Sequence, residues 1–141
     1  MRLGVLLSAL ATGAVAQGMA PIADLVQADG PVPAYTRCAG FLAALQERGS
    51  EAEFGPDAWA NIAAGREDLE AAALILSAEA GDIADVLQDI YLAIGETRDA
   101  YLARFETNFD ESGEIIAGDP QLEEDLGVCA GLAERAKEGT N

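Results

Sequence analysis

Residues 82–108 read DIADVLQDIYLAIGETRDAYLARFETN, and this stretch decides the fold. Apolar residues recur in it at spacings of three and four, which is the pattern of one face of an α-helix. These residues are Ile83, Leu87, Ile90, Ile94 and Tyr101. Asp82 is a residue type that caps helix N-termini, and Gly81 before it is typical of a helix end. The stretch therefore predicts an amphipathic helix that begins after Asp82 and reaches about residue 105 or 108.

Three further segments show the same periodicity, which predicts helices over 34–48, from about 57 to the break at Gly81, and over 119–139. Their apolar faces hold Tyr35, Cys38, Leu42 and Leu45; Ile62, Gly65, Leu69, Ala72 and Leu76; and Leu122, Leu126, Cys129 and Ala133. Gly49 is a stop for the first of them, and Asp119-Pro120 supplies a cap and a first-turn proline for the last. Gly65 within a helix would allow a close helix crossing.

The break at Gly81 has one alternative, a single bent helix over 57–108, because the apolar phase continues across the glycine. Such a helix would be about 78 Å long at 1.5 Å per residue, which a chain of this size cannot cover. We therefore expect two helices.

Four amphipathic helices with short connections, and no credible strand, predict an all-α fold, a four-helix up-down-up-down bundle. This topology puts the first helix beside the last, so the only two cysteines, Cys38 and Cys129, would meet there. An even cysteine count in an oxidising compartment indicates a disulfide. We expect a disulfide bond between the first and fourth helices.

The start of the chain has the three parts of a secretory signal peptide. Arg2 supplies a positive charge, residues 3–15 are uncharged and apolar, and Ala14-Val15-Ala16 is a small-x-small cleavage site. We expect residues 1–16 to be removed between Ala16 and Gln17, residues 17–33 to form an N-terminal strap, and residues 34–141 to form the helical domain. The processed protein would then be periplasmic or secreted, with no membrane span.

The composition is acidic, with 25 Asp and Glu residues against 8 Lys and Arg, and it contains no His. The net charge of −17 disfavours nucleic acid and anionic lipid and favours a basic protein partner. The lack of His removes the most frequent general base and transition-metal ligand. We expect no enzymatic activity and no cofactor, and we interpret the acidic residues of 82–99 as a solvated face. Glu67-Asp68-Glu70 could be a docking patch, and Glu123-Glu124-Asp125 complements a helix dipole.

Residues 108–119 read NFDESGEIIAGD and resemble a twelve-residue EF-hand loop. The resemblance implies weak calcium binding through Asn108, Asp110, Ser112, Glu114 and Asp119. The loop departs from the motif in having Asn first, Ile116 at the ninth position and Asp rather than Glu last. The alternative is a helix–helix connection whose glycine and aspartate residues serve turns and caps.

Three aromatic residues, Trp59, Tyr91 and Tyr101, have the spacing of core or boundary positions and could line a pocket for a small molecule. The sequence thus predicts a small exported binding or interaction protein. Its alternatives are a calcium-binding protein and a small-molecule carrier.

Overall fold

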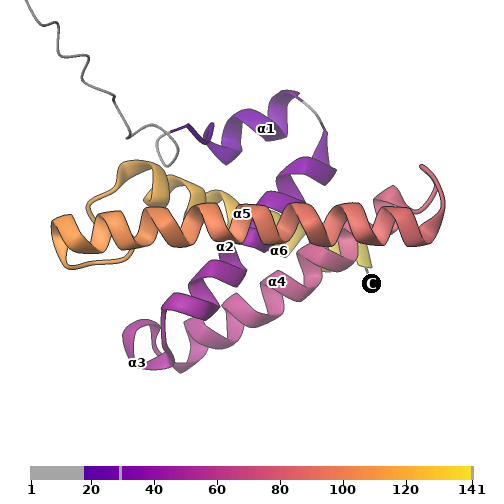
Figure 1. The fold of residues 1–141 in the computed structure, drawn as a ribbon. Helices are drawn as coiled ribbons and strands as arrows, with labels where there is room; N and C mark the ends of the chain where they lie inside the picture. The colour runs from indigo at the N-terminus through magenta and orange to yellow at the C-terminus, as the bar shows by residue number, and fades with distance from the viewer. Residues whose placement is uncertain (1–17, 29, 141) are drawn as a thin grey trace, which may run out of the picture.

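The computed structural model describes residues 18–28 and 30–140, and within them every regular element is a helix (Figure 1). The helices are α1 (Ile22–Ala28), α2 (Pro31–Arg48), α3 (Glu51–Phe54), α4 (Pro56–Ser77), α5 (Ile83–Ser112) and α6 (Pro120–Thr140). The all-α prediction is confirmed, and the four long helices are those expected from the periodicity. The predicted signal peptide, residues 1–16, lies outside the described residues.

The helix boundaries follow from capping residues. α4 ends at Ser77 and α5 begins at Ile83, so the break near Gly81 is confirmed and the single bent helix is wrong. The Asp82 carboxylate accepts a hydrogen bond of 2.9 Å from the backbone N–H of Ala84. Asp119 does the same for α6, because its Oδ1 accepts hydrogen bonds from the N–H groups of Gln121 and Leu122. Each carboxylate satisfies N–H groups that have no partner inside the helix.

Three boundaries differ from the prediction. Pro31 and Pro33, expected in the strap, form the first turn of α2, where a missing N–H costs no hydrogen bond. The strap itself contains α1, and the predicted loop over 49–56 contains the one-turn helix α3. α5 continues to Ser112, so the first half of the stretch predicted as a loop, residues 108–119, is helical.

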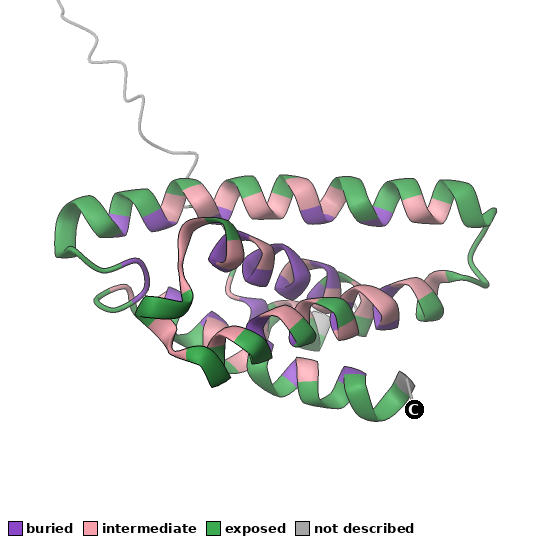
Figure 2. Cartoon of the chain, turned by 90° about the horizontal axis from the view of Figure 1, so that it is seen from below, coloured by how far each residue is buried: buried purple, intermediate pink, exposed green. Residues whose placement is uncertain are grey.

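The packing also differs from a simple up-down-up-down order, because α2 is central (Figure 2). It packs most extensively against α4 and α5 and also contacts α1 and α6. α4 packs on α6, while α4 and α5 touch only slightly. Within the described chain the backbones of α5 and α6 stay apart, and long side chains such as Tyr101 and Arg104 of α5 reach α6. Helices that follow one another in the sequence are therefore not always packed together in space, as α4 and α5 show.

Small residues on α2 explain this arrangement. Ala34, Ala39 and Ala44 are fully buried, and Gly40 is buried too. A Cβ on Gly40 would lie 2.7 Å from the Thr97 Cβ and 2.9 Å from the Ile94 carbonyl oxygen, so α5 crosses α2 at this glycine. Gly65 allows a similar close approach between α4 and α6, because a Cβ at this position would lie 3.2 Å from the Cβ of Ala133 on α6. The close crossing expected at Gly65 is thus present.

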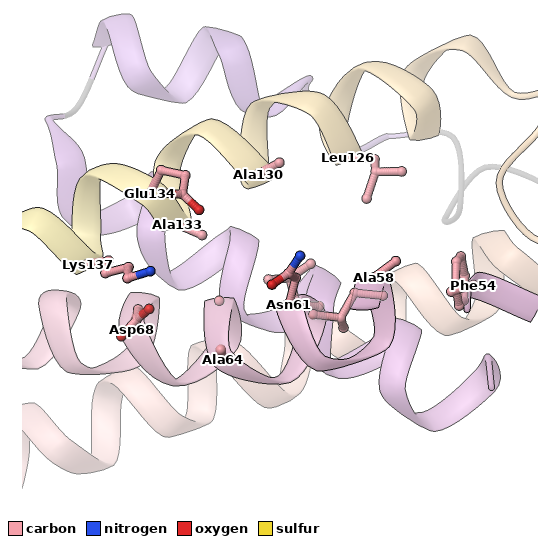
Figure 3. Close-up of a pocket in the computed structure, with 13 residues that line it drawn as sticks. Phe54, Ala58, Asn61, Ala64, Asp68, Leu126, Ala130, Ala133, Glu134 and Lys137 are labelled. Atoms are coloured by element: carbon pink, nitrogen blue, oxygen red, sulfur yellow. The ribbon is translucent and has the colours of Figure 1, made fainter. Parts of the chain in front are cut away.

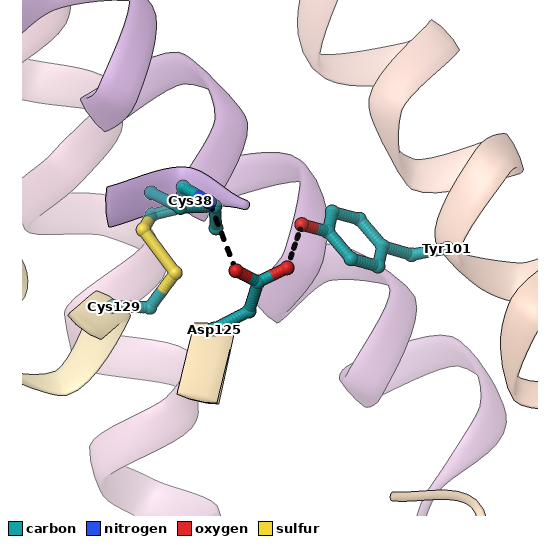
Figure 4. Close-up of a disulfide and its surroundings, with 5 residues drawn as sticks. Cys38, Tyr101, Asp125 and Cys129 are labelled. Carbon is teal, nitrogen blue, oxygen red and sulfur yellow. Dashed lines mark hydrogen bonds between the residues drawn. A yellow bond between two sulfur atoms is a disulfide. The ribbon is translucent and has the colours of Figure 1, made fainter. Parts of the chain in front are cut away.

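The disulfide between Cys38 and Cys129 joins α2 to α6, as predicted, and both cysteines are fully buried (Figure 4). The expectation that it links the first and last long helices is confirmed, although α6 has α4 rather than α2 as its main neighbour.

Candidate functional site

The apolar faces of α4 and α5 continue beyond the core. On α4, Ile62 and Leu69 are buried, whereas Leu76, one heptad further along the same face, is 53% exposed. On α5, Ile94 and Ile90 are buried, whereas Ile83 is 54% exposed. The periodicity thus identified the correct helix faces but placed Leu76 and Ile83 in a core that does not reach them.

We call residues 74–92, the last turn of α4, its connection and the first turns of α5, the hairpin end. Residues 74–89 include no buried residue. The hairpin end holds five of the large apolar side chains that are exposed in the described chain: Ile75, Leu76, Ile83, Tyr91 and Leu92. Leu76 and Ile83 belong to the faces that form the core elsewhere on α4 and α5, and exposed apolar side chains beside polar residues are typical of an interaction surface.

The cause of this exposure is the unequal length of the helices. α5 has 30 residues and α2 has 18, so their lengths are about 45 Å and about 27 Å at 1.5 Å per residue. The first turn of α2, at Val32 and Pro33, faces α5 at Asp89 and Ile90. α5 therefore overhangs its main neighbour by its first turns, as Figure 2 shows for the end of the long helix that joins α4.

A shallow hollow of about 330 Å³ lies inside the hairpin end. Val86 and Ile90 give it an apolar wall, and three carboxylate residues, Asp82, Asp85 and Asp89, also line it. Ser77, Ala80 and Gly81 complete the lining from the connection. Apolar and anionic groups thus meet at one place on the surface.

The hairpin end is acidic, and Arg37 of α2 is the basic residue that shares a hollow with its Asp89. Between Arg66 and Arg98 the sequence contains no Lys, Arg or His and eight acidic residues: Glu67, Asp68, Glu70, Glu79, Asp82, Asp85, Asp89 and Glu96. Three residues of the acidic face expected on this helix, Asp82, Asp85 and Asp89, line the hollow beside Val86 and Ile90. Such a surface presents a negative potential to whatever approaches it.

A second hollow, also of about 330 Å³, lies between α4 and α6 (Figure 3). Leu42, Ile62 and Leu126 contribute apolar groups to it, together with the small residues Ala58, Ala64, Gly65, Ala130 and Ala133. Asn61, Asp68, Glu134 and Lys137 bring polar groups to the same cleft, and Phe54 closes one end. The cleft exists because small side chains face each other from the two helices.

The three aromatic residues predicted to line a pocket have separate surroundings. The ring of Trp59 stacks on Phe54, with 6.2 Å between centroids. Tyr91 is 52% exposed on α5, and Tyr101 is fully buried against Phe41. None of the three lines the cleft between α4 and α6. The structure does not bring them together, because Tyr91 and Tyr101 are about 15 Å apart along α5 at 1.5 Å per residue and Trp59 lies beside Phe54 at the start of α4.

The residues of the EF-hand-like stretch hold their own connection together. Asn108 is buried, and its Nδ2 donates to the carbonyl oxygens of Glu114 and Ala117 at 2.9 and 3.1 Å. The Ser112 hydroxyl donates to the Asn108 carbonyl and accepts from the N–H of Glu114. Asp110 and Glu114 are exposed at the surface. These contacts are those of a helix–helix connection.

Asp119, the last of the predicted ligands, forms an ion pair with Arg104 through two hydrogen bonds of 2.7 and 2.8 Å. Burial acts to raise the pKa of Asp119, but the Arg104 guanidinium and the N–H groups of Gln121 and Leu122 outweigh it, so the pKa is lowered. Within residues 18–28 and 30–140, no three acidic or cysteine side chains are arranged as a metal site.

The burial of Asp125 was not predicted. Asp125 is fully buried beside the disulfide, where it accepts hydrogen bonds from the Tyr101 hydroxyl at 2.7 Å and from the Ile22 N–H at 2.9 Å (Figure 4). Its sequence neighbours Glu123 and Glu124 are exposed, so the run of three acidic residues gave no indication that Asp125 alone is buried. A possible sign was its spacing of four from Cys129, which puts both on one helix face.

Comparison with protein family models, curated proteins and solved structures gives no match for this chain. In the part of the chain that the structure describes, no helix has both the length and the apolar composition needed to cross a bilayer.

Proposed function

We propose that this chain is an exported, non-enzymatic binding protein that contacts a partner protein through the hairpin end. The observation that carries the proposal is the exposure of Leu76 and Ile83. Both belong to the faces that form the core elsewhere on α4 and α5, yet each is more than half exposed.

A partner would gain free energy by covering these side chains. Complete burial of a Leu or Ile side chain contributes about 1.5–3 kcal/mol, so covering a half-exposed one contributes about 1 kcal/mol. Leu76 and Ile83, with Tyr91 about 80° round α5 from Ile83, could supply the apolar centre of an interface. Leu92, in contrast, lies on the opposite side of α5 from Ile83. Aromatic residues are enriched in such centres, and the surrounding carboxylates would form a polar rim.

Two features of the sequence support the location and the lack of catalysis. The predicted signal peptide over 1–16 and a fully buried disulfide suit a protein that folds in an oxidising compartment. The chain has no His, and its buried acidic group, Asp125, is engaged by Tyr101 and Ile22 rather than facing a cavity.

Site-specific photo-crosslinking tests the proposal in the cells that export the protein. A benzophenone amino acid replaces Leu76 or Ile83 in two variants, and Phe109, 39% exposed at the other end of α5, in a control. We expect one discrete heterologous adduct, identified by mass spectrometry, from the two hairpin positions and not from position 109. Absence of an adduct, or the same adducts from all three positions, would contradict the proposal.

A second candidate function is transport of a small molecule, which the cleft between α4 and α6 favours. Its apolar groups would cover a small hydrophobic ligand, and Asn61 or Lys137 would face a polar group on that ligand. A thermal-shift screen of a metabolite panel tests this candidate, with Ala130→Trp as the variant that fills the cleft. A ligand that stabilises Ala130→Trp as much as the natural protein would not be bound there.

A further inference from the structure

We infer that the segment bound by the hairpin end is a basic amphipathic helix of the partner protein; this inference rests on the proposed function. It specifies the charge, the secondary structure and the approximate length of the bound segment.

The charge follows from the carboxylates that line the hollow. Asp82, Asp85 and Asp89 lie at the same opening as Val86 and Ile90. Arg37 of α2 lines a neighbouring hollow with Asp89, but no Lys or Arg of the described chain lines the opening that holds Asp82 and Asp85. If the partner carried acidic or uncharged residues around its apolar contact, the negative charges of these carboxylates would have no opposite charge across the interface. Lys or Arg on the partner would form ion pairs with them.

The secondary structure follows from the shape of the surface. The ends of α4 and α5 present an uncovered apolar position on each helix face, Leu76 and Ile83, and Val86 beside Ile83 packs against the core. Elsewhere in this protein the same two faces pack on α2, which is itself a helix. A helix is therefore the element that continues this packing, and it would use apolar residues at spacings of three, four and seven.

The length follows from the distance along α5. From Ile83 to Ile90 the helix rises about 10 Å at 1.5 Å per residue, so about two turns of the partner would occupy the uncovered stretch. Basic residues on the outer sides of those two turns would reach Asp85 and Asp89.

Other occupants fit the charge less well. A second copy of this chain brings the same carboxylates and the same net charge of −17, so the two hairpin ends would repel each other. An anionic lipid surface is repelled for the same reason.

The test uses a synthetic amphipathic helical peptide of Leu and Lys and a scrambled peptide of identical composition. Fluorescence anisotropy measures their binding to the processed protein at about 50 and about 300 mM sodium chloride. We expect the helical peptide to bind about tenfold more tightly than the scrambled one, and Leu76→Ser/Ile83→Ser to lose about tenfold in affinity. Asp85→Asn/Asp89→Asn should weaken binding and flatten its salt dependence. Asp110→Asn/Glu111→Gln, with the same change in charge at the other end of α5, should do neither.

Equal binding of the two peptides, or equal weakening by both charge variants, would overturn the inference, because bulk charge would then explain the binding. Sedimentation that shows a dimer lost in Leu76→Ser/Ile83→Ser would overturn it in favour of a second copy. If cross-linking from positions 76 and 83 identifies a partner but the helical peptide does not bind, this inference fails while the proposed function stands. If neither experiment gives binding, both fail.

Discussion

The backbone N–H of Ile22 donates a hydrogen bond to the carboxylate of Asp125, which follows 103 positions later in the chain. Two further bonds fix the same segment, because Arg37 donates to the Ala20 carbonyl and Gln121 to the Met19 carbonyl. Ile22 itself is fully buried. The first described residues are thus held against α2 and α6, immediately after the predicted cleavage site.

Asp125→Ala should destabilise the protein and release this segment. The substitution leaves the Ile22 N–H and the Tyr101 hydroxyl without a partner, at a cost of about 1–3 kcal/mol for each buried donor. Urea unfolding measures the loss, and hydrogen exchange should quicken over residues 18–28. Glu124→Ala, at an exposed neighbouring position, should change stability by no more than about 0.5 kcal/mol. Equal stability of the two variants would contradict the structural role of Asp125.

Tyr101 should make stability fall at alkaline pH. Burial, together with the Asp125 charge, raises the pKa of Tyr101 above its usual value of 10.0, although Arg37 partly opposes this. Because the folded pKa exceeds the unfolded one, the stabilisation is fully present below about pH 10 and is lost as the pH rises from there towards the folded value.

Urea unfolding of the natural protein and of Tyr101→Phe at about pH 10 and about pH 11 isolates this contribution. The stability advantage of the natural protein should shrink by up to about 1.4 kcal/mol over that pH unit. Tyr91, half exposed on the same helix, supplies the control variant Tyr91→Phe, which should show no such change. A pH-independent difference for Tyr101→Phe would show that its hydroxyl ionises normally.

Reduction of the Cys38–Cys129 disulfide should lower stability considerably. The two cysteines are 91 residues apart, and the chain-entropy model assigns a loop of that length about 4–5 kcal/mol, an amount that measured values often do not reach. Cys38→Ala/Cys129→Ala should lower the melting temperature, and reductant should then have no further effect. A variant as stable as the oxidised protein would contradict this prediction.

The connection over 108–119 should be insensitive to calcium. Asn108, Ser112 and Asp119 use their polar side chains to hold the connection and to cap α6. The melting temperature should stay constant on addition of millimolar calcium and should fall for Asn108→Ala, which removes the two hydrogen bonds that the Asn108 amide donates to the carbonyl oxygens of Glu114 and Ala117. Stabilisation by calcium that Asp119→Asn abolishes would restore the EF-hand interpretation.

Helical periodicity predicted the four long helices, and capping residues predicted their boundaries at Asp82 and Asp119. Periodicity shows which face of a helix is apolar, but not how far along the helix a neighbour extends. For this reason Leu76 and Ile83 were assigned to the core, although the shorter α2 does not reach them.

The central place of α2 was also missed, although its small residues, from Ala34 to Ala44, were visible in the sequence. A helix with Ala and Gly on several sides can be approached from several sides, as Gly40 shows. Asp125 could not be distinguished from Glu123 and Glu124, because its partners Ile22 and Tyr101 come from distant parts of the chain.

The measurement that tests the account most directly is the yield of the photo-crosslinked adduct from position 83 in two backgrounds. Leu76→Ser alters the apolar group of the hairpin end, and Val26→Ser, at a position 37% exposed on α1, is the matched control. We predict that Leu76→Ser lowers the yield severalfold while Val26→Ser leaves it unchanged. The same yield in both backgrounds would show that the apolar hairpin end is not a specific binding surface.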